Sequence, residues 1–424
     1  MRKAYIMILV VVLVFSVFTF VSTRNAEANE EKIPIKIGIL QDMTGGLAFH
    51  GEWGYRGAIA AIKRINESGG IAGRPIEYFL EDSATKAETG LTKFKKLILQ
   101  NEVDFVIGPC NTAVDLAITP YAKVVNTIYF MGGTALKQTE EGNRYVFRLV
   151  NNMKSEMMAL AIVAMDEWET YYGIGADYEW GHSVVNETKI ILQKEGKKIL
   201  DEVYTPAGTT DFIPFLLKID PKKVEAIVIG LYGADAVAFI TQAAQLGYTK
   251  DLSIIGNWGI SMGQEPKAFG EAADNEAVWV TTIHPMRTEY IPDELQKYEI
   301  AFRELIDMTL DGHDVKTGKA GNPMFAWSTY EAMNMIKIII EETGWESKEN
   351  NPAFIKALEG RTFKASYDFP QGDIHMRAED HQGFTDGSVE RILDGKWVTV
   401  RRVPVKDLYY ETSADYTQEE FVTK

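Results

Sequence analysis

Two segments in the first third of the chain decide the fold: residues 103–112 read VDFVIGPCNT, and residues 127–135 read TIYFMGGTA. Each is an apolar run, rich in β-branched and aromatic residues, that reaches glycine and then small polar residues before a helix-compatible segment. This pattern predicts a strand, a tight turn and the start of a helix, twice within one βαβ unit. Because the carboxyl ends of parallel strands share the sheet edge where open α/β sheets bind ligands, we expect both turns at such an edge.

The two predicted turns have the chemistry of an anion site. N–H groups at the start of a helix have no intrahelical acceptor, and the helix dipole adds partial positive charge there. Asn111, Thr112 and Thr134 add side-chain donors, and Gly132 and Gly133 allow a ligand to approach the backbone closely. The alternative is that Asn111 and Thr134 only cap helices and that the glycines only form turns.

The composition limits the classes of protein that fit. With 424 residues the chain can form two or three domains, and its 46% hydrophobic and 25% charged content is ordinary for a globular protein. Its net charge of −16 disfavours nucleic acid as a partner. Cys110 is the single cysteine, which excludes an intramolecular disulfide and a cysteine zinc cluster. Its place after a predicted buried strand indicates a small buried filler.

The N-terminus has the pattern of a secretory signal peptide. Arg2 and Lys3 are followed by an almost wholly apolar run over residues 4–22, and residues 26–28, AEA, supply the small side chains of a cleavage site. We expect a signal peptide over residues 1–28 that is cleaved after Ala28, and a periplasmic or extracytoplasmic location. The alternative is an uncleaved anchor, since the apolar run is nearly long enough to span a bilayer.

The rest of the chain alternates strand and helix patterns. Strands are predicted at 35–40 and 76–80, and amphipathic helices at 51–66 and 87–100. The second half repeats this order, with helices at 155–167, 182–195 and 235–246, a loop at 173–180, and strands at 198–204, 226–230, 252–256 and 277–282. Such alternation implies the α/β class, with parallel, doubly wound sheets in two lobes.

A series of motifs, taken in order along the chain, resembles one family. They are DMTG (42–45), GYRGA (54–58), INESGGIAGR (65–74), ED (81–82), IGP (107–109), the glycine-rich segment 173–181 and AWSTYEA (326–332). The set resembles the type 1 periplasmic solute-binding proteins of the leucine/isoleucine/valine-binding family, which serve ABC importers of branched-chain amino acids, amides and small organic acids. The resemblance covers about residues 33–403. It implies two Rossmann-like lobes, joined by a hinge of three crossovers, that enclose a ligand when they close.

The resemblance also implies a division of the chain and a set of partners. We expect an N-terminal lobe of residues 29–150 and 284–365, a C-terminal lobe of residues 151–283 and 366–404, and an acidic tail over 405–424. We expect a monomer that binds a small molecule and docks on a membrane ABC permease.

In the first lobe, the resemblance implies a site that holds a carboxylate. The family's aromatic residue falls at His50, with Trp53 one turn further along the helix. The hydroxyl that takes the ligand carboxylate falls at Asn111 or Thr112, since the spacing is ambiguous by one residue. The turn that also holds this carboxylate matches Gly132–Thr134.

In the second lobe, the resemblance implies aromatic contacts and one departure from the family. The two aromatic positions match Trp180 and Tyr232, but the family's acid, which pairs with an amino acid's ammonium, falls at Trp258. A buried ammonium without a carboxylate partner is costly, and Trp258 offers an apolar, π-rich wall instead. A displaced counter-charge from Asp235 or Asp42 is the alternative.

These features favour a solute-binding protein that captures a small organic carboxylate with an aromatic or apolar body. The alternatives are a binder of branched-chain or other amino acids or amides, and a sensor that presents its ligand to a receptor. An enzyme is disfavoured, because the sequence has no Gly-x-Ser-x-Gly elbow, no phosphate-binding loop and no recurring metal-ligand spacing. The protease-like DMTG loop has no second copy. We therefore expect no catalytic residues, no metal and no cofactor.

Overall fold

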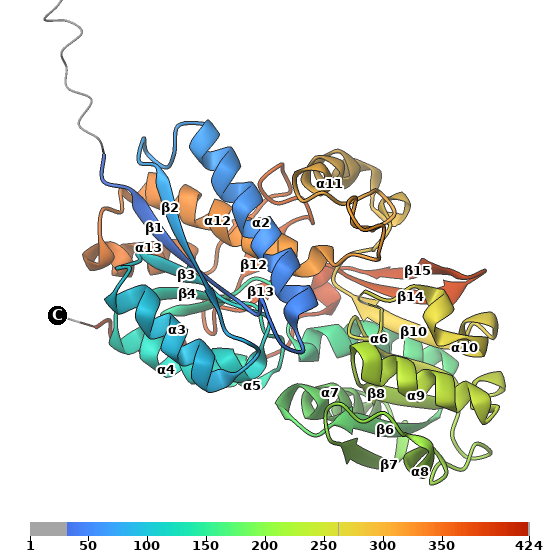
Figure 1. Cartoon of the computed structure of the whole chain (residues 1–424). Coiled ribbons are helices and arrows are strands. Elements are labelled where there is room, and N and C mark those ends of the chain that lie inside the picture. The colour runs from blue at the N-terminus through green and yellow to red at the C-terminus, as the bar shows by residue number, and fades with distance from the viewer. Residues whose placement is uncertain (1–31, 262, 423–424) are drawn as a thin grey trace, which may run out of the picture.

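The computed structural model describes residues 32–261 and 263–422 and shows two α/β lobes joined at a hinge (Figure 1). The predicted signal peptide, residues 1–28, lies outside the described residues. None of the described helices combines the length and the apolarity that a membrane crossing requires. A mainly parallel sheet flanked by helices forms the centre of each lobe, as the sequence predicts.

The first lobe contains a five-stranded parallel sheet. Its strands are β1 (Ile35–Gln41), β2 (Ile76–Asp82), β3 (Phe105–Ile107), β4 (Ile128–Met131) and β5 (Val146–Arg148), in the order β2-β1-β3-β4-β5. Its helices are α2 (Ala48–Glu67), α3 (Ala87–Leu99), α4 (Thr112–Val124), α5 (Lys137–Glu140), α11 (Asp293–Leu305), α12 (Pro323–Thr343) and α13 (Asn351–Leu358). Because β3 and β4 are neighbouring parallel strands, the turns that follow them lie at one edge, as predicted.

The helix pair α2 and α12 forms the centre of the first lobe's core. A Cβ atom at Gly57 would lie 2.0 Å from the carbonyl oxygen of Ala326, so glycine is required where the two helices touch. The Thr329 hydroxyl donates to the carbonyl of Gly54 at 2.7 Å across the same contact. This packing fixes the N-terminal turn of α2, which carries one of the predicted site residues.

The second lobe contains a seven-stranded sheet. Its strands are β6 (Thr170–Ala176), β7 (Lys198–Thr205), β8 (Ala226–Gly230), β9 (Ser253–Asn257), β10 (Val278–Thr282), β14 (Gly387–Leu393) and β15 (Lys396–Val403), in the order β15-β14-β10-β9-β8-β6-β7. Its helices are α6 (Met153–Glu167), α7 (Glu179–Lys194), α8 (Ile213–Leu216), α9 (Gly233–Gln245) and α10 (Glu271–Asp274). The strands from β6 to β10 are parallel, and the β14–β15 hairpin adds antiparallel at the edge.

The strand β6 stands where the sequence predicts a loop. A Cβ atom at Gly173 would lie 2.7 Å from the Val185 side chain, and one at Gly175 would lie 2.8 Å from the carbonyl oxygen of Gly181. The prediction for residues 173–180 was wrong over β6 because these glycines serve the close approach of α7 to the strand, and not a turn.

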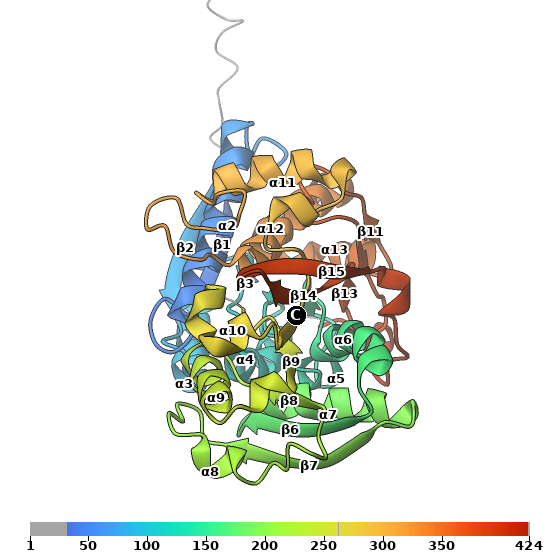
Figure 2. The ribbon, with the colours of Figure 1, turned by 90° about the vertical axis from the view of Figure 1, so that its right-hand side faces the viewer.

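In the described part of the chain, three crossovers join the lobes: after β5, after β10, and before β14. The third follows a small antiparallel sheet of β11 (Thr362–Phe363), β12 (Ile374–Met376) and β13 (Gly383–Phe384). This small sheet lies with the first lobe, because Asp368 pairs with Arg64 at 2.7 Å and the ring of His381 stacks on Phe147 at 4.1 Å. Residues 366–384, expected in the second lobe, thus pack on the first, and Figure 2 shows β14 and β15 on the side of the second lobe that faces α11 and α12.

The C-terminal segment returns from β15 to the first lobe. It contains the short helices η5 (Val405–Asp407) and η6 (Tyr416–Gln418). The Ser155 hydroxyl in α6 donates to the carbonyl of Leu408 at 3.1 Å, and further along the Tyr416 hydroxyl accepts from the N–H of Gly142 at 2.7 Å. Glu419 pairs with Lys123 at 2.7 Å. The segment is therefore docked over the hinge and the first lobe.

Candidate ligand-binding site

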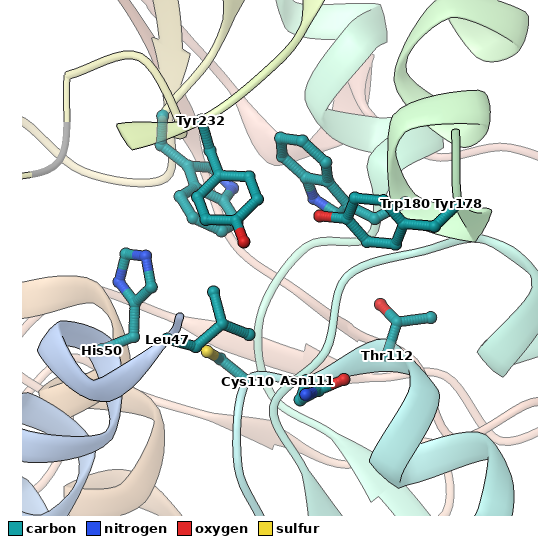
Figure 3. A pocket seen from close by; sticks show the side chains of 9 residues that line it. Leu47, His50, Cys110, Asn111, Thr112, Tyr178, Trp180 and Tyr232 are labelled. Carbon is teal, nitrogen blue, oxygen red and sulfur yellow. The ribbon is translucent and has the colours of Figure 1, made fainter. Parts of the chain in front are cut away.

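A cavity of about 340 Å³ lies between the lobes, at the carboxyl edges of both sheets (Figure 3). Its lining is aromatic, apolar or small and polar. The first lobe supplies Leu47, His50, Cys110, Asn111 and Thr112, and the second supplies Tyr178, Trp180, Tyr232 and Trp258.

The first-lobe wall of the cavity is the start of α4. β3 ends at Ile107, the chain turns, and Asn111 caps the helix by accepting from the N–H groups of Ala113 and Val114 at 3.0 and 3.3 Å. Cap formation leaves the Asn111 and Thr112 side chains at the cavity floor, as Figure 3 shows. Helix-start N–H groups and the helix dipole favour a negative group at this position.

His50, in the first turn of α2, is neutral. Its Nδ1 lies 2.6 Å from Nδ2 of Asn322, whose Oδ1 already accepts from the N–H of Met324 at 3.1 Å. The Asn322 amide therefore donates to Nδ1, which places the histidine hydrogen on Nε2. Burial lowers the pKa of His50 to about 4, so the ring is an uncharged donor at neutral pH.

The second-lobe wall is aromatic. Tyr178 and Trp180 stack with ring centres 6.1 Å apart, Tyr232 meets Trp180 edge-on at 5.7 Å, and Trp258 lies 5.9 Å from Trp180. The indole N–H of Trp180 is buried and has no acceptor in the described structure. In Figure 3 the hydroxyl groups of Tyr178 and Tyr232 point into the space between the walls. This wall can cover an apolar or aromatic ligand body and offers donors beside it.

The lining residues carry no formal charge at neutral pH. Burial raises the pKa of the Cys110 thiol and of the Tyr178 phenol well above their usual values, so both stay protonated. The nearest acid to the floor, Asp42, lies behind it, with one carboxyl oxygen 3.8 Å from the Cys110 sulfur. Burial raises the pKa of Asp42 to about 6. The site therefore offers neutral hydrogen-bond donors and rings to a ligand.

Comparison with known proteins identifies the family. The model of the family described as periplasmic binding protein matches residues 34–396. The chain belongs to the periplasmic binding protein family.

Relatives and solved structures agree with this assignment. The leucine-, isoleucine-, valine-, threonine- and alanine-binding protein of Pseudomonas aeruginosa is 24% identical over 343 residues, which cover 80% of this chain and 85% of the relative. A Rhodopseudomonas palustris solute-binding protein, solved with 4-hydroxybenzoate, superposes with a TM-score of 0.75 at 17% identity, over 88% of this chain and 97% of that one. A leucine-binding protein from Thermotoga maritima gives 0.73 at 19% identity, over 88% and 98%. The two structures establish the shared two-lobe fold.

In this periplasmic binding protein, the fold brings together most of the residues predicted for the site. Those that line the cavity are His50, Asn111, Thr112, Trp180, Tyr232 and Trp258. Those that do not are Trp53, Gly132, Gly133 and Thr134. That the six lining residues contact a ligand remains a prediction.

The glycine turn after β4 is closed by the protein itself. The N–H of Gly132 donates to the carbonyl of Pro109 at 3.0 Å, and that of Gly133 donates to Asp115 in α4 at 2.8 Å. Both amides that were expected to hold a carboxylate are therefore occupied. The Thr134 hydroxyl is buried and finds no partner in the described structure, but it does not line the cavity. Asp115 thus already accepts from this turn, and a ligand contact with Gly132–Thr134 stays a prediction.

Trp53 is directed into the core of the first lobe. The guanidinium of Arg56 lies 4.4 Å above its ring, and a Cβ atom at Gly321 would lie 2.9 Å from the ring edge. Its side chain packs on the segment before α12, whereas His50, one turn earlier in α2, reaches the cavity.

Three lining residues were not predicted for the site. Tyr178 precedes Trp180 by two positions at the start of α7, which is a signal that the sequence offered. The sequence predicts that Cys110 is a small buried side chain, and the structure places it in the floor of the cavity. Leu47, directly before α2, has no distinguishing pattern in the sequence.

Proposed function

We propose that this protein captures a small organic carboxylate with an aromatic or apolar body and delivers it to a membrane ABC permease. One observation carries the proposal: a single cavity has the start of α4 on one wall and four aromatic side chains on the other. The carboxylate would bind the Thr112 hydroxyl and the positive end of the α4 dipole, while Asn111, which caps the N–H groups of Ala113 and Val114, would shape the floor beside it. The rings would cover the body of the ligand, and each buried ring contributes roughly 2–3 kcal/mol.

The chemistry of the wall argues against an ordinary α-amino acid. An ammonium group buried without a carboxylate costs several kcal/mol, and position 258 carries an indole. Asp42 lies behind Cys110 and accepts from the Ser83 hydroxyl. Asp235 accepts from the N–H of Gly208 at 2.7 Å and lines an outer hollow that adjoins the inner cavity through His50 and Tyr232. Neither acid lines the inner cavity itself.

The two solved neighbours support both ligand classes at the level of the fold, since one was solved with 4-hydroxybenzoate and the other is named a leucine-binding protein. The neutral, aromatic lining favours the first class. Ligand contacts with both walls would shift the lobes toward the closed arrangement, which the permease would then recognise. We propose export by the signal peptide of residues 1–28 and action as a periplasmic or extracytoplasmic monomer.

Mass spectrometry of the compound that co-purifies with the protein under native conditions tests the ligand class directly. Isothermal titration then compares benzoate and 4-hydroxybenzoate with leucine and phenylalanine. We expect the acids to bind at micromolar concentrations or below, and the amino acids at least about tenfold more weakly, because their ammonium has no partner. Tight leucine binding without binding of the acids would show that the protein is an amino-acid binder of the same family.

A further inference from the structure

The indole N–H of Trp180 is a buried hydrogen-bond donor that no acceptor of the described structure satisfies. Trp180 is 5% exposed, and its side chain lines the cavity between the lobes. Buried donors in native proteins are nearly always paired, because an unpaired donor has lost its bonds to water without replacing them. An unpaired donor in the lining of a binding cavity therefore indicates an acceptor that arrives with the ligand.

The packing of Trp180 turns its nitrogen toward the cavity. A Cβ atom at Gly259 would lie 3.0 Å from Cη2 of Trp180, so the six-membered end of the indole packs against the turn after β9. The nitrogen belongs to the five-membered ring at the other end of the indole, and in Figure 3 it lies on the side of the ring toward the space between the walls. The rings of Tyr178 and Tyr232, with centres 6.1 and 5.7 Å away, hold the indole in this position.

The other lining side chains leave this donor to the ligand. Asn111 has the one side-chain carbonyl oxygen among the lining residues, and that oxygen already accepts from two N–H groups of α4. The hydroxyls of Tyr178 and Tyr232 make no hydrogen bond to any described residue, and Nε2 of His50 carries a hydrogen, since Nδ1 is the atom that lies against Asn322. The cavity thus has free donors on its aromatic side as well as at the α4 floor.

We propose that Trp180 is a specificity-determining residue of the site: its indole N–H donates to an uncharged acceptor oxygen on the body of the ligand. This inference deepens the proposed function and rests on it, since the carboxylate of the same ligand is proposed to bind at the start of α4. An indole N–H is a donor only, so a carbonyl, ether or hydroxyl oxygen satisfies it and a methyl group does not. The second oxygen is uncharged because the lining residues carry no positive charge that could balance a second carboxylate.

Matched pairs of ligands test this role by titration calorimetry. 4-Acetylbenzoate and 4-isopropylbenzoate have the same number of heavy atoms, and only the first has an acceptor oxygen outside the carboxylate; the 3-substituted pair presents the same groups in another direction. We expect the wild type to bind an acetyl compound at least about tenfold more tightly than its isopropyl partner, because the isopropyl group leaves the buried N–H unpaired. In Trp180→Phe, which keeps a ring and removes the N–H, the difference should shrink to less than about threefold.

Trp279→Phe is the matched control. The indole N–H of Trp279 is also buried without an acceptor in the described structure, but the residue lies on β10 and does not line the cavity. This variant should keep the preference for the acetyl compound. The indole N–H signal of Trp180 in the ¹⁵N-labelled protein, assigned with Trp180→Phe, gives a readout that does not depend on affinity. It should move further to low field with the acetyl compound than with the isopropyl compound.

The outcomes separate this inference from the proposed function. Equal binding of the paired compounds by the wild type would overturn the role of Trp180 and leave the carboxylate class in place. A preference that Trp180→Phe keeps and Trp258→Phe loses would also overturn it, since Trp258 is the other lining residue whose indole N–H has no acceptor in the described structure. If neither benzoate nor any of the paired compounds binds, the proposed function fails and this inference fails with it.

Discussion

The two walls of the cavity are built in different ways. The first-lobe wall is built from two helix starts, Leu47 and His50 at α2 and residues 110–112 at α4. The second-lobe wall is assembled after three separate strand ends, those of β6, β8 and β9, which supply Tyr178 and Trp180, Tyr232, and Trp258. A helix start binds a negative group whatever the rest of the ligand is, whereas rings from separate loops fit one shape of ligand body. The difference indicates that the first wall provides affinity for carboxylates in general and the second decides which carboxylate binds.

A substitution of Trp258 should have the largest effect on which ligand binds. In Trp258→Asp, the ring contact is lost and a carboxylate faces the cavity, so benzoate affinity should fall by roughly 100-fold or more, about 3 kcal/mol. The same variant should gain affinity for phenylalanine, because its ammonium then has a partner. Titration calorimetry with both compounds measures the change. Trp258→Asn is the matched control, since it loses the ring without adding the charge, and a gain of phenylalanine binding there would contradict the argument.

Trp180 should make the second-largest contribution to benzoate affinity. It is 5% exposed, and its ring contacts Tyr178, Tyr232 and Trp258, so Trp180→Ala opens the centre of the wall. We expect benzoate affinity to fall by roughly 30- to 100-fold, about 2–3 kcal/mol. The melting temperature should fall only by the amount that the cavity left by the missing ring explains. Trp180→Phe keeps a ring but removes the N–H, so it should cost less than Trp180→Ala. A loss equal to that of Trp180→Ala would assign the effect to the N–H and not to the ring.

The same difference explains which parts of the site could be predicted. The α4 part of the first wall follows from one continuous pattern, because strand, turn and helix start at residues 103–112 are encoded locally. The Gly132–Thr134 turn has the same pattern, but Asp115 already accepts from Gly133, and a contact made across the fold has no local signal. Asn257 donates to Glu156 at 3.2 Å although the two residues are 101 positions apart, so this contact has no local signal either.

The sequence predicts the parts of the fold that local patterns encode. It does not predict the parts whose position depends on packing between distant segments. The alternation of strands and helices gave both sheets, since periodicity records burial on each face. Gly173 and Gly175 indicated a loop, yet they let α7 approach β6. The placement of residues 366–384 on the first lobe depends on contacts such as Asp368 with Arg64, which the sequence order does not reveal.

The hydroxyl of Thr112 tests the first wall alone. Thr112→Val removes one donor at the cavity floor with little change in volume, so we expect the affinity for every carboxylate to fall by a similar factor, roughly tenfold. The comparison of benzoate with 4-hydroxybenzoate measures this uniformity. Thr119→Val, on the same helix, is the control, because the Thr119 hydroxyl donates to the carbonyl of Asp115 away from the cavity. A loss of affinity for only one of the two ligands would mean that the first wall also discriminates between ligands with different bodies.

The pH dependence of binding should show the smallest effect, and it too arises behind the first wall. Burial raises the pKa of Asp42 to about 6 from 3.8, so its contribution to folding is complete below pH 3.8 and is lost as the pH rises through 6. Above that pH, Asp42 is a carboxylate behind Cys110 and close to where the ligand carboxylate would lie. Benzoate affinity should therefore fall by about threefold between pH 5 and pH 7.5. Asp42→Asn should flatten this dependence, whereas Asp251→Asn, an exposed change in the second lobe, should leave it as in the wild type. A wild-type benzoate affinity that rises between pH 5 and pH 7.5 would contradict this prediction, because ionised Asp42 can only repel a carboxylate bound at the start of α4.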